Sequence, residues 1–393
     1  MSLLELKPHT TKKPTVIIIG GGAAGLWTAI AMLEQGWSGE ELTIVEPSGK
    51  TDNDRTWSYW AKASLFPPHV EQQIFSKIVL ASDGKEQSYE LGDYRYYSVR
   101  SSQFYAYAKE VLAKAGVTWL NFKAKSISEK TMEVEVLLSN NAQVFADYVL
   151  DSRPPEIEMP SQRYNATLQH FGGWFVAMPS AVFDVKEVVF MDFIKVEEGV
   201  AFFYVIPSSS SEALVEIAVF SENIWAHDRY DDKLSGYIKG KYGASPATIR
   251  EREYGVIPMT DQPFWKESTR RIWNIGTRGG WVQPSSGYAF TRTARFAKEV
   301  AQKLSQTSHS AWVPSTIQQV FNAVMLGYII ENPNKAGSIF FNLFARNGAS
   351  RTFDFLDEVS SFSQTIQLMW TCPQVPFASR AVKEALLRAL GKK

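Results

Sequence analysis

The chain is poor in cysteine and histidine, and its charges balance. Cys372 is the single cysteine in 393 residues, which excludes an internal disulfide and any metal site built from several thiolates. The five histidines are scattered without the spacing of metal ligands, so we expect no bound metal. Lysine plus arginine equals aspartate plus glutamate, at 41 each, and this balance gives no reason to expect nucleic acid as a partner.

Long apolar segments are also absent. No run of about 18 apolar residues exists, so the sequence predicts no transmembrane helix. Residues 1–13 lack the apolar core of a signal peptide, and we expect them to lead into the first strand. Aromatic residues, by contrast, are abundant, with 12 Trp, 16 Tyr and 24 Phe. A well-filled core accounts for many of these rings, and a large apolar ligand would account for the rest.

A glycine-rich turn at residues 20–25 is the strongest motif. An unbroken apolar run at 15–19 precedes it and predicts a buried parallel strand. Residues 24–33 have the spacing of a helix, and residues 42–45 predict a second strand that ends at an acidic residue. This order is typical of a dinucleotide-binding unit, whose binding residues we predict to be Gly20, Gly22, Ala24, Gly25 and Glu46.

Each residue of that turn has a physical role in the prediction. Gly20 permits the tight turn, Gly22 lets a pyrophosphate approach the backbone, and Gly25 lets the helix pack close to the strand. The Glu46 carboxylate can accept hydrogen bonds from ribose hydroxyls and disfavours a 2′-phosphate, which favours FAD or NAD over NADP. The alternative is a glycine-rich turn in another α/β fold.

The middle of the chain has the pattern of strands. Ser101 and Ser102 can cap a helix that Gly116 ends. The sequence then predicts a β-hairpin from residues 134–138 and 144–151, with its turn at 139–141. An antiparallel sheet and one helix are expected next, with strands at 168–176, 187–193, 200–206 and 213–220 and the helix at 231–242.

A second glycine-rich junction between a strand and a helix follows at residues 271–288, far from the first. The remaining residues, from about 315, are mostly helical in pattern and end in a basic stretch. We therefore predict an α/β (α+β) fold in three parts: a discontinuous nucleotide-binding domain from residues 1–155 and 265–310, an antiparallel sheet domain at 156–264, and a helical region at 311–393.

Several short motifs occur in order along the chain, beginning with the glycine turn and continuing with 53–57 (NDRTW), 151–153 (DSR), 169–174 (QHFGGW), 191–193 (MDF), 204–207 (YVIP), 214–216 (LVE), 253–259 (EYGVIPM), 276–280 (GTRGG) and 355–358 (FLDE). In this order they resemble the flavin-dependent lycopene β-cyclases of carotenoid synthesis, especially the bacterial type. The resemblance covers nearly the whole chain.

The resemblance implies a fold like that of the flavoprotein hydroxylases and FAD, active when reduced, as cofactor. NAD(P)H is then the expected electron donor, and the expected reaction converts the linear ends of lycopene, or of a related acyclic carotenoid, to β-rings without net redox change. It also implies further cofactor-binding residues, namely Arg55, Thr56, Trp57, Asp151, Gly276, Gly279, Gly280, Pro284, Gly287 and Tyr288. The protein is expected in the cytoplasm, docked peripherally on a membrane, because such a substrate dissolves only in lipid.

Such a cyclisation needs an acid in a dry, apolar cavity, because burial raises the pKa of a carboxylic acid and keeps it protonated. Glu216 is the single charged residue in the apolar strand 214–220 and occupies the position of the acid–base residue of the family. A solvent-facing residue on a strand is the alternative interpretation for Glu216, and the reduced flavin is the alternative proton donor. The family often follows this glutamate with another acidic residue and Thr, whereas here Ile217 and Ala218 follow, so an adjacent second carboxylate is missing.

Glu253 and Asp192 are secondary acid–base candidates. An ion pair with Arg250 or Arg252 is the alternative for Glu253, and a structural hydrogen bond is the alternative for Asp192. Aromatic faces can hold a cation, with a gain of about 0.5–2 kcal/mol each. The candidates for this role are Trp57, Trp174 and Trp281, for which core packing is the other interpretation.

Two other functions fit the same scaffold. A flavin monooxygenase usually has Asp after the glycine of the second junction and Gly after the aspartate of the middle strand, whereas this chain has Thr277 and Ser152. A non-catalytic polyene carrier would not require Glu216. For membrane docking we expect residues 339–344 and the amphipathic stretch 377–393 to form the contact, with an ordinary packed terminal helix as the alternative for the latter.

Overall fold

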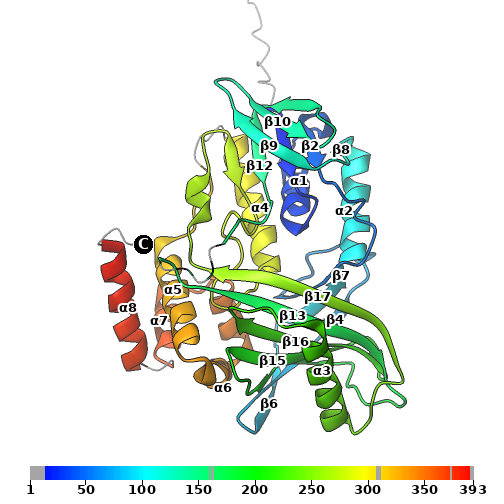
Figure 1. Ribbon diagram of the computed structural model, residues 1–393, viewed down its shortest axis with the longest axis vertical. Helices are drawn as coiled ribbons and strands as arrows, with labels where there is room; N and C mark the ends of the chain where they lie inside the picture. The colour runs from blue at the N-terminus through cyan, green and yellow to red at the C-terminus, as the bar shows by residue number, and fades with distance from the viewer. Residues whose placement is uncertain are drawn as a thin grey trace, which may run out of the picture.

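The computed structural model describes residues 14–157, 159, 161, 163–306, 311–371 and 374–389. Expectations about residues 1–13, Cys372 and the last residues from Leu390 lie outside the described residues. The chain forms an upper lobe built on a parallel sheet and a lower lobe built on a larger, mostly antiparallel sheet, with the helices α5 to α8 beside the lower lobe (Figure 1).

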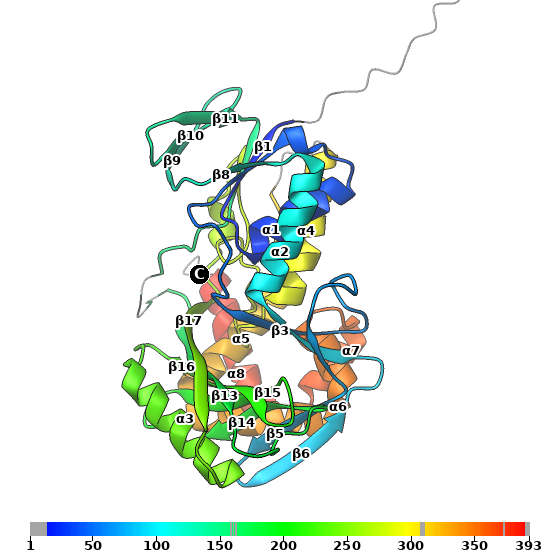
Figure 2. The same cartoon turned by 90° about the vertical axis from the view of Figure 1, so that its right-hand side faces the viewer.

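The upper lobe contains a five-stranded parallel sheet in the order β18-β12-β1-β2-β8. Its central strand, predicted from the apolar run before the glycines, is buried along its whole length. The helices α1, α2 and α4 lie together against this sheet (Figure 2). The elements of this part are β1 (Val16–Ile19), α1 (Ala23–Glu34), β2 (Leu42–Val45), α2 (Ser101–Ala115), β8 (Thr118–Leu120), β12 (Tyr148–Asp151), β18 (Ile272–Asn274) and α4 (Phe290–Ser305).

The predicted hairpin after α2 is only partly right. A three-stranded sheet forms from β9 (Ala124–Glu129), β10 (Val134–Leu138) and β11 (Gln143–Ala146). The stretch predicted as one second strand is divided at Asp147, because β12 leaves the hairpin and pairs with β1 in the parallel sheet. The Asp147 carboxylate accepts hydrogen bonds from Thr15 N and Oγ1 and holds this crossing point.

The lower lobe is a seven-stranded sheet in the order β17-β13-β16-β15-β14-β5-β6. The four strands predicted between residues 168 and 220 are all present, and one pairing, β14 with β5, is parallel. Two strands of this sheet come from residues 77–90, within the part assigned from sequence to the nucleotide-binding domain. The strands are β5 (Lys77–Ser82), β6 (Lys85–Glu90), β13 (Ala166–Ala177), β14 (Glu187–Ile194), β15 (Val200–Pro207), β16 (Glu212–Ser221) and β17 (Thr248–Thr260).

Successive side chains of β13 point alternately to helix α3 (His227–Tyr242) on one face of the lower sheet and to the upper lobe on the other face. The residues Gly172 and Trp174 face helix α3, since a Cβ at Gly172 would lie 2.8 Å from the Tyr230 ring and Trp174 Nε1 donates to Asp231. The odd-numbered residues Gln169 and Phe171 face the opposite side, toward the upper lobe. A small sheet of β3 (Thr56–Ala61), β4 (Gln73–Phe75) and β7 (Arg95–Arg100) joins the lobes.

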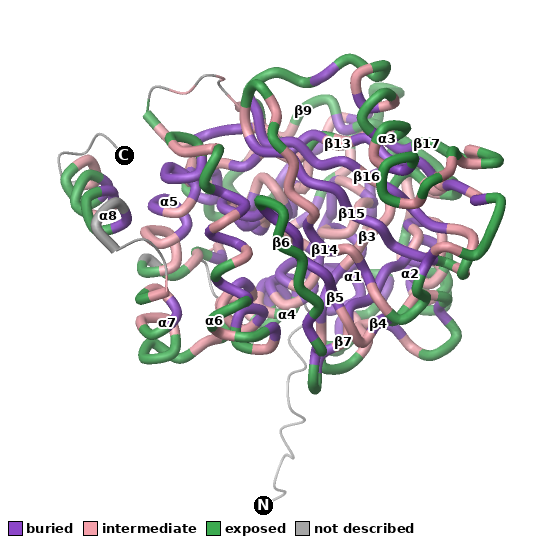
Figure 3. The backbone as a smooth tube through the Cα atoms, turned by 90° about the horizontal axis from the view of Figure 1, so that it is seen from below, coloured by how far each residue is buried: buried purple, intermediate pink, exposed green. Residues whose placement is uncertain are grey.

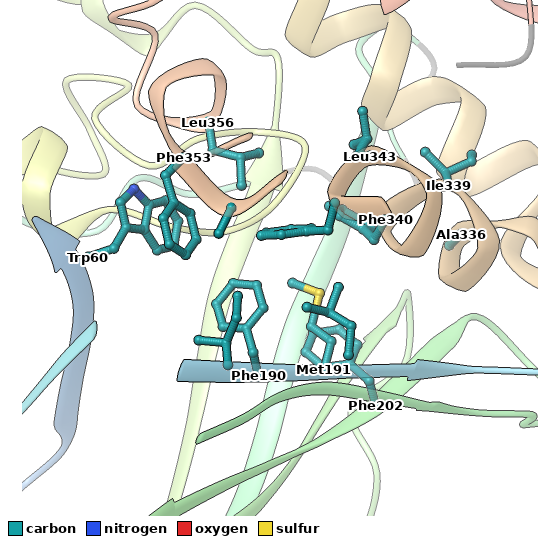
Figure 4. Packing of buried hydrophobic residues seen from close by; sticks show 14 of the residues in the cluster. Trp60, Phe190, Met191, Phe202, Ala336, Ile339, Phe340, Leu343, Phe353 and Leu356 are labelled. Atoms are coloured by element: carbon teal, nitrogen blue, oxygen red, sulfur yellow. The ribbon is translucent and has the colours of Figure 1, made fainter. Parts of the chain in front are cut away.

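The C-terminal third is helical, as predicted, with α5 (Thr316–Glu331), α6 (Ala336–Leu356), α7 (Phe362–Met369) and α8 (Gln374–Ala389). Short 3-10 turns lie at Gly39–Glu41, Phe264–Glu267 and Pro333–Lys335. The aromatic segment at 339–344 packs over the lower sheet instead of forming an outer surface, because Phe340 and Leu343 are buried in the same core cluster as Met191 and Phe202, and Phe340 stacks on Phe193 (Figure 4). The expectation that this segment meets a membrane is therefore wrong.

The terminal helix α8 is packed on one side and open on the other. Phe377, Arg380 and Glu384 are buried, and Arg380 pairs with Glu331 on α5 and with Glu384. Val382 and Leu386 lie on the outward face and are exposed. Figure 3 shows the same division along the helix, with buried and exposed segments alternating. The helix thus has the packed inner face of the alternative interpretation and an exposed apolar outer face.

His170 on β13 gives a prediction about stability and pH. Its imidazole is buried between Tyr230 Oη (2.6 Å) and Ser221 Oγ (2.8 Å), and burial lowers its pKa to about 4. Unfolded histidine has a pKa of about 6.5, so the unfolded chain binds an extra proton between pH 6.5 and pH 4, and stability falls as pH drops through that window. We expect this group to account for a loss of about 3 kcal/mol in the free energy of unfolding.

Chemical denaturation at several pH values measures this effect. His170→Gln should be less stable than the wild type at pH 7 but should lose less stability between pH 6.5 and pH 4, because it has no proton to gain. His69→Gln, at an exposed position, is the matched control. An unchanged pH dependence in His170→Gln would assign the acid sensitivity to other groups.

Candidate active site

The glycine turn after β1 forms a cradle with one open position. A Cβ at Gly25 would lie 1.9 Å from the Gly20 carbonyl oxygen, so this glycine permits the close contact of helix and turn that the sequence predicts. At Gly22 a Cβ would meet no atom within 4 Å. Gly22 is also the N-cap of α1, where no side chain caps the first amides and no acidic residue lies in the first turn. Unpaired amides and the helix dipole therefore face open space, which suits an anionic group such as a pyrophosphate.

Glu46 lies at the end of β2, beside the cradle. Its carboxylate is buried and accepts hydrogen bonds from Gly21 N (2.7 Å) and Ser48 N (2.9 Å). Ser48 Oγ also donates to the Oε1 atom that accepts from Ser48 N, so Oε2, which accepts from Gly21 N, is the oxygen with a lone pair left for another hydrogen bond. Glu46 is among the residues that line the cavity described next. The predicted contact with ribose hydroxyls stays a prediction that this geometry allows.

A cavity of about 790 Å³ connects the cradle to the lower sheet. Its upper walls carry Gly20, Gly22, Ala24 and Glu46, and its lower walls carry Glu216. The other predicted cofactor-binding residues among its lining are Arg55, Thr56, Trp57, Gly276, Gly287 and Tyr288. The nucleotide-binding motif and the candidate acid therefore line the same cavity.

The second glycine-rich junction approaches the same cavity from the side. Gly276, Gly280 and Gly287 have φ angles of 62°, 74° and 74°, which only glycine adopts without strain. The helix α4 begins after Ala289 without a side-chain cap, so a second set of free N-terminal amides lies at the cavity wall. Five predicted cofactor residues do not line the cavity, namely Gly25, Asp151, Gly279, Gly280 and Pro284.

The Asp151 carboxylate is occupied by protein partners. It accepts hydrogen bonds from Arg153 Nε (2.9 Å) and Arg153 Nη2 (2.8 Å), and Arg278 Nε lies 3.8 Å away. Arg153 itself lines the cavity. The geometry therefore gives Asp151 a positioning role toward Arg153, in place of the direct cofactor contact that the sequence suggested.

Glu216 and Glu253 meet across β13, the strand that lies between their own strands in the lower sheet. Glu216 on β16 and Glu253 on β17 both lie opposite Gly173 on β13, so the three residues share one face. Gly173 has no side chain, and a Cβ there would lie 3.3 Å from Glu216 Cβ and 3.3 Å from Glu253 Cγ. The two carboxyl groups therefore reach each other over the glycine and form a hydrogen bond.

The surroundings of the two carboxyl groups favour protonation of Glu216 over protonation of Glu253. Burial raises the pKa of Glu216 well above its ordinary value, and the nearby Glu253 raises it further. Burial also raises the pKa of Glu253, but hydrogen bonds from Glu216 and Thr56 Oγ1 (3.0 Å) and the charge of Arg100 oppose that rise. Glu216 is thus the protonated member that donates to Glu253 and presents its carboxyl group to the cavity.

Glu253 corrects two expectations from sequence. The described arginines next to it in sequence pair elsewhere, Arg250 with Glu212 and Arg252 with Asp231. The second carboxylate that is missing next to Glu216 along the chain is present in space, supplied by β17. Sequence patterns could not show this, because the pairing joins residues 37 positions apart through a third strand.

Three tyrosines surround the Glu216 carboxyl group, and sequence analysis named only one of them as a site residue. Tyr204 lies opposite Glu216 in the sheet, and its hydroxyl is 2.9 Å from that of Tyr288. The Tyr96 hydroxyl is hydrogen-bonded to Ser58, and its ring is buried. Burial raises the pKa of all three hydroxyl groups, so they are neutral at physiological pH. Alternation in β7 and β15 was the one signal that could have indicated Tyr96 and Tyr204.

Asp192 lies on the other side of the sheet. It pairs with Phe203 of β15, whose side chain points away from the cavity, and it accepts hydrogen bonds from Tyr237 Oη (2.9 Å) and Lys241 Nζ (3.0 Å) on α3. This is the structural interpretation left open for it, so we exclude Asp192 from the site. Of the candidate tryptophans, Trp57 lines the cavity, whereas Trp174 faces α3 and Trp281 is enclosed in the upper core.

Two searches of the described residues bear on metals and membranes. No group of three His, Cys, Asp or Glu side chains in this part of the chain is arranged to hold a metal ion. No described helix combines the length and the apolar character needed to cross a bilayer.

Solved structures share the fold at low sequence identity. A geranylgeranyl bacteriochlorophyll reductase-like protein of Thermoplasma acidophilum superposes with a TM-score of 0.59 at 12% identity, over 93% of this chain and 98% of that one. The flavin-dependent brominase Bmp2 superposes with a TM-score of 0.60 at 13% identity, over 97% and 100%. The fold is therefore the α/β fold of flavoprotein hydroxylases and halogenases, as the sequence predicted.

Sequence relatives are more specific. Lycopene beta cyclase of Arabidopsis thaliana is 24% identical over 322 residues, which span 76% of this chain and 62% of the plant protein. Lycopene beta-cyclase of Paracoccus sp. (strain N81106 / MBIC 01143) is 26% identical over 172 residues, 42% of each chain. A family model described as lycopene cyclase protein matches residues 15–382. With nearly its whole length covered by that match, this chain belongs to the lycopene cyclase family.

Proposed function

We propose that the protein is an FAD-dependent enzyme that closes the linear end groups of lycopene, or of a related acyclic carotenoid, into β-rings. One observation carries the proposal: a protonated glutamic acid, Glu216, faces a cavity that also contains the nucleotide-binding cradle. The names of the plant and bacterial relatives support the choice of substrate.

The residues present fit FAD. The open position at Gly22 and the uncapped start of α1 suit a pyrophosphate, and the uncapped start of α4 suits an electron-rich ring edge. The acceptor capacity left on Glu46 Oε2 suits a ribose hydroxyl. Reduced flavin supplies an electron-rich ring that stabilises positive charge beside it. NAD(P)H is our proposed source of its electrons.

In the proposed reaction, the Glu216 carboxyl group gives its proton to the terminal double bond of the substrate. The resulting tertiary cation is attacked by the next double bond along the chain, which closes a six-membered ring and moves the positive charge onto a ring carbon. A proton then leaves the neighbouring ring carbon for the carboxylate pair, which restores protonated Glu216 and hydrogen-bonded Glu253. Electrons and atoms balance within the substrate, so the reaction is an isomerisation.

The walls around Glu216 suit such a cation. Tyr96, Tyr204 and Tyr288 present neutral rings near the carboxyl group, and each cation–π contact contributes about 0.5–2 kcal/mol. The phenol hydroxyls are held by Ser58 or by each other. Few nucleophilic groups therefore compete with the intramolecular double bond for the cation.

Supplying lycopene to a host that expresses this chain, and to purified protein with reduced FAD, tests the proposal. We expect γ-carotene and β-carotene by chromatography, with no oxygen consumed in proportion to product. Consumption of oxygen and NAD(P)H in equal amounts with product would identify a monooxygenase instead. Carotenoid binding without turnover would identify a polyene-binding flavoprotein.

We further propose that the protein docks on the cytoplasmic face of a membrane through a surface different from the one first expected. Residues 311–330 and 359–371 contain no charged residue. They surround a second pocket of about 190 Å³ whose lining includes Ile317 and Phe362, which are 52% and 66% exposed. The charged residue in the pocket lining, Glu358, is already buried in an ion pair with Arg292, so contact with lipid would remove Ile317 and Phe362 from water without desolvating a further charge.

Vesicle co-sedimentation distinguishes this surface from α8. Ile317→Asp/Phe362→Asp should weaken binding at least about tenfold, because two apolar contacts are replaced by charges. Ile74→Asp/Phe145→Asp, at exposed positions far along the chain, is the matched control. If Val382→Asp/Leu386→Asp on α8 has the larger effect and added salt weakens binding of the wild type, the basic helix is the docking surface instead.

A further inference from the structure

Gln169 is a buried polar side chain that the reaction described above does not use. It lies on the cavity side of β13, two residues before Phe171, and is 7% exposed. Its Oε1 atom is fully buried and has no hydrogen-bond partner within the described part of the chain. A buried amide oxygen without a partner is costly in a folded protein, so it indicates a partner that binds from outside the chain.

The surroundings of Gln169 indicate where that partner lies. Its Oε1 atom is wedged against the turn before α4, where a Cβ at Gly287 would lie only 1.7 Å away. Gly287 and Tyr288 line the cavity, as do Ala289 and Phe290 at the uncapped start of α4. The glycine therefore leaves room for the amide, and the amide stands beside the free N-terminal amides of the helix.

The start of α4 and the Gln169 side-chain oxygen have opposite hydrogen-bonding roles. The start of α4 offers hydrogen-bond donors, whereas Gln169 Oε1 can only accept. A ligand edge that satisfies both must carry acceptors and an N–H donor close together. The isoalloxazine ring has such an edge: carbonyl oxygens next to the N3–H group, and an N5–H group that exists only in the reduced state.

We propose that Gln169 is a positioning residue for the flavin, and that its Oε1 atom accepts a hydrogen bond from a ring N–H group. The inference rests on the proposed binding of FAD and goes beyond it by naming the residue that orients the ring system. It also explains why Gly287 must be a glycine, since any side chain there would displace the amide.

The test compares the wild type, Gln169→Leu and the surface control Gln87→Leu. The dissociation constants of FAD are measured for the oxidised and the dithionite-reduced cofactor, together with the melting temperature of the apoprotein. We expect Gln169→Leu to weaken FAD binding about tenfold, the loss of one hydrogen bond in a buried site. The apoprotein should melt at the same or a higher temperature, because leucine removes an unsatisfied polar atom.

The redox dependence identifies the donor. A tenfold loss confined to reduced FAD lowers the midpoint potential by about 30 mV and assigns the bond to N5–H. Equal losses in both states leave the potential unchanged and assign it to N3–H. Gln169→Glu, which is neutral when protonated and retains an acceptor oxygen, should recover part of the affinity at low pH.

Two results would overturn the inference, and they differ from each other. If the wild type binds FAD and Gln169→Leu binds oxidised and reduced FAD as tightly as the wild type does, Gln169 does not contact the flavin. If Gln169→Leu lowers the melting temperature of the apoprotein and leaves FAD affinity unchanged, Gln169 has a structural role. Failure of the wild type to bind FAD would instead refute the proposed function itself.

Discussion

Glu216→Gln should lower the rate of ring formation about 10²–10⁴-fold, the usual cost of removing a positioned proton-transfer group. Glutamine has the shape of protonated glutamic acid, and Glu216 is protonated in the folded protein because its pKa is raised by burial. The substitution therefore removes the transferable proton without burying a new charge. FAD content and the melting temperature at pH 7 should stay close to those of the wild type.

Product yield per bound flavin is the measurement. Glu251→Gln, an exposed glutamate on the same strand as Glu253, is the matched control and should retain full activity. Glu253→Gln should reduce activity less than Glu216→Gln, because Glu253 accepts the hydrogen bond of the acid but does not line the cavity. Normal product yield from Glu216→Gln would remove it from the mechanism and direct attention to Glu253 or the cofactor.

Gly22→Val should abolish FAD binding while preserving the fold. The φ and ψ angles of Gly22 are −83° and −173°, an extended conformation that valine adopts readily, and its Cβ would meet no atom within 4 Å. The new side chain would occupy the space in front of the α1 amides, where the pyrophosphate is expected to lie. We expect affinity to fall at least about 100-fold, equivalent to about 2.8 kcal/mol.

Flavin absorbance after gel filtration, together with circular dichroism, measures both parts of this prediction. Gly236→Val is the matched control, because Gly236 also has open space around its Cβ but lies on the exposed side of α3. Gly25→Val is unsuitable as a probe, since its side chain would collide with the Gly20 carbonyl and disturb the fold. Full flavin content in folded Gly22→Val would place the pyrophosphate elsewhere.

The sequence patterns correctly predicted those helices and strands whose formation depends on interactions between residues close together in the chain. The strand before Gly20, the helix at 101–115 with Gly116 in the left-handed conformation, and the alternating strands between 168 and 220 appear as expected. In each case the decisive interactions lie within one element or one turn, such as a buried apolar run or a helix end.

Long-range pairing decided the rest. Glu216 and Glu253 come together because β13 separates their strands and contributes Gly173 at that register. Asp192 was a reasonable candidate by sequence, but its strand pairs so that its side chain faces α3. The aromatic residues of 339–344 could have formed a core or a surface, and only the position of α6 over the sheet distinguishes the two. Register and layer order are not visible in one sequence.

The position of β5 and β6 in the lower sheet affects how the protein can be made. Lys77 on β5 pairs with Glu187 on β14, which the ribosome synthesises 110 residues later. At about 5–20 residues per second, the hairpin waits roughly 5–20 s for its neighbour. During that interval Ile78, Val79 and Leu80, all buried in the finished protein, are exposed beside an unpaired strand edge. We therefore expect the yield of correctly folded protein in a heterologous host to depend on how well chaperones cover this hairpin. Slower growth does not by itself shorten the exposure, because the exposure time is set by the rate of translation.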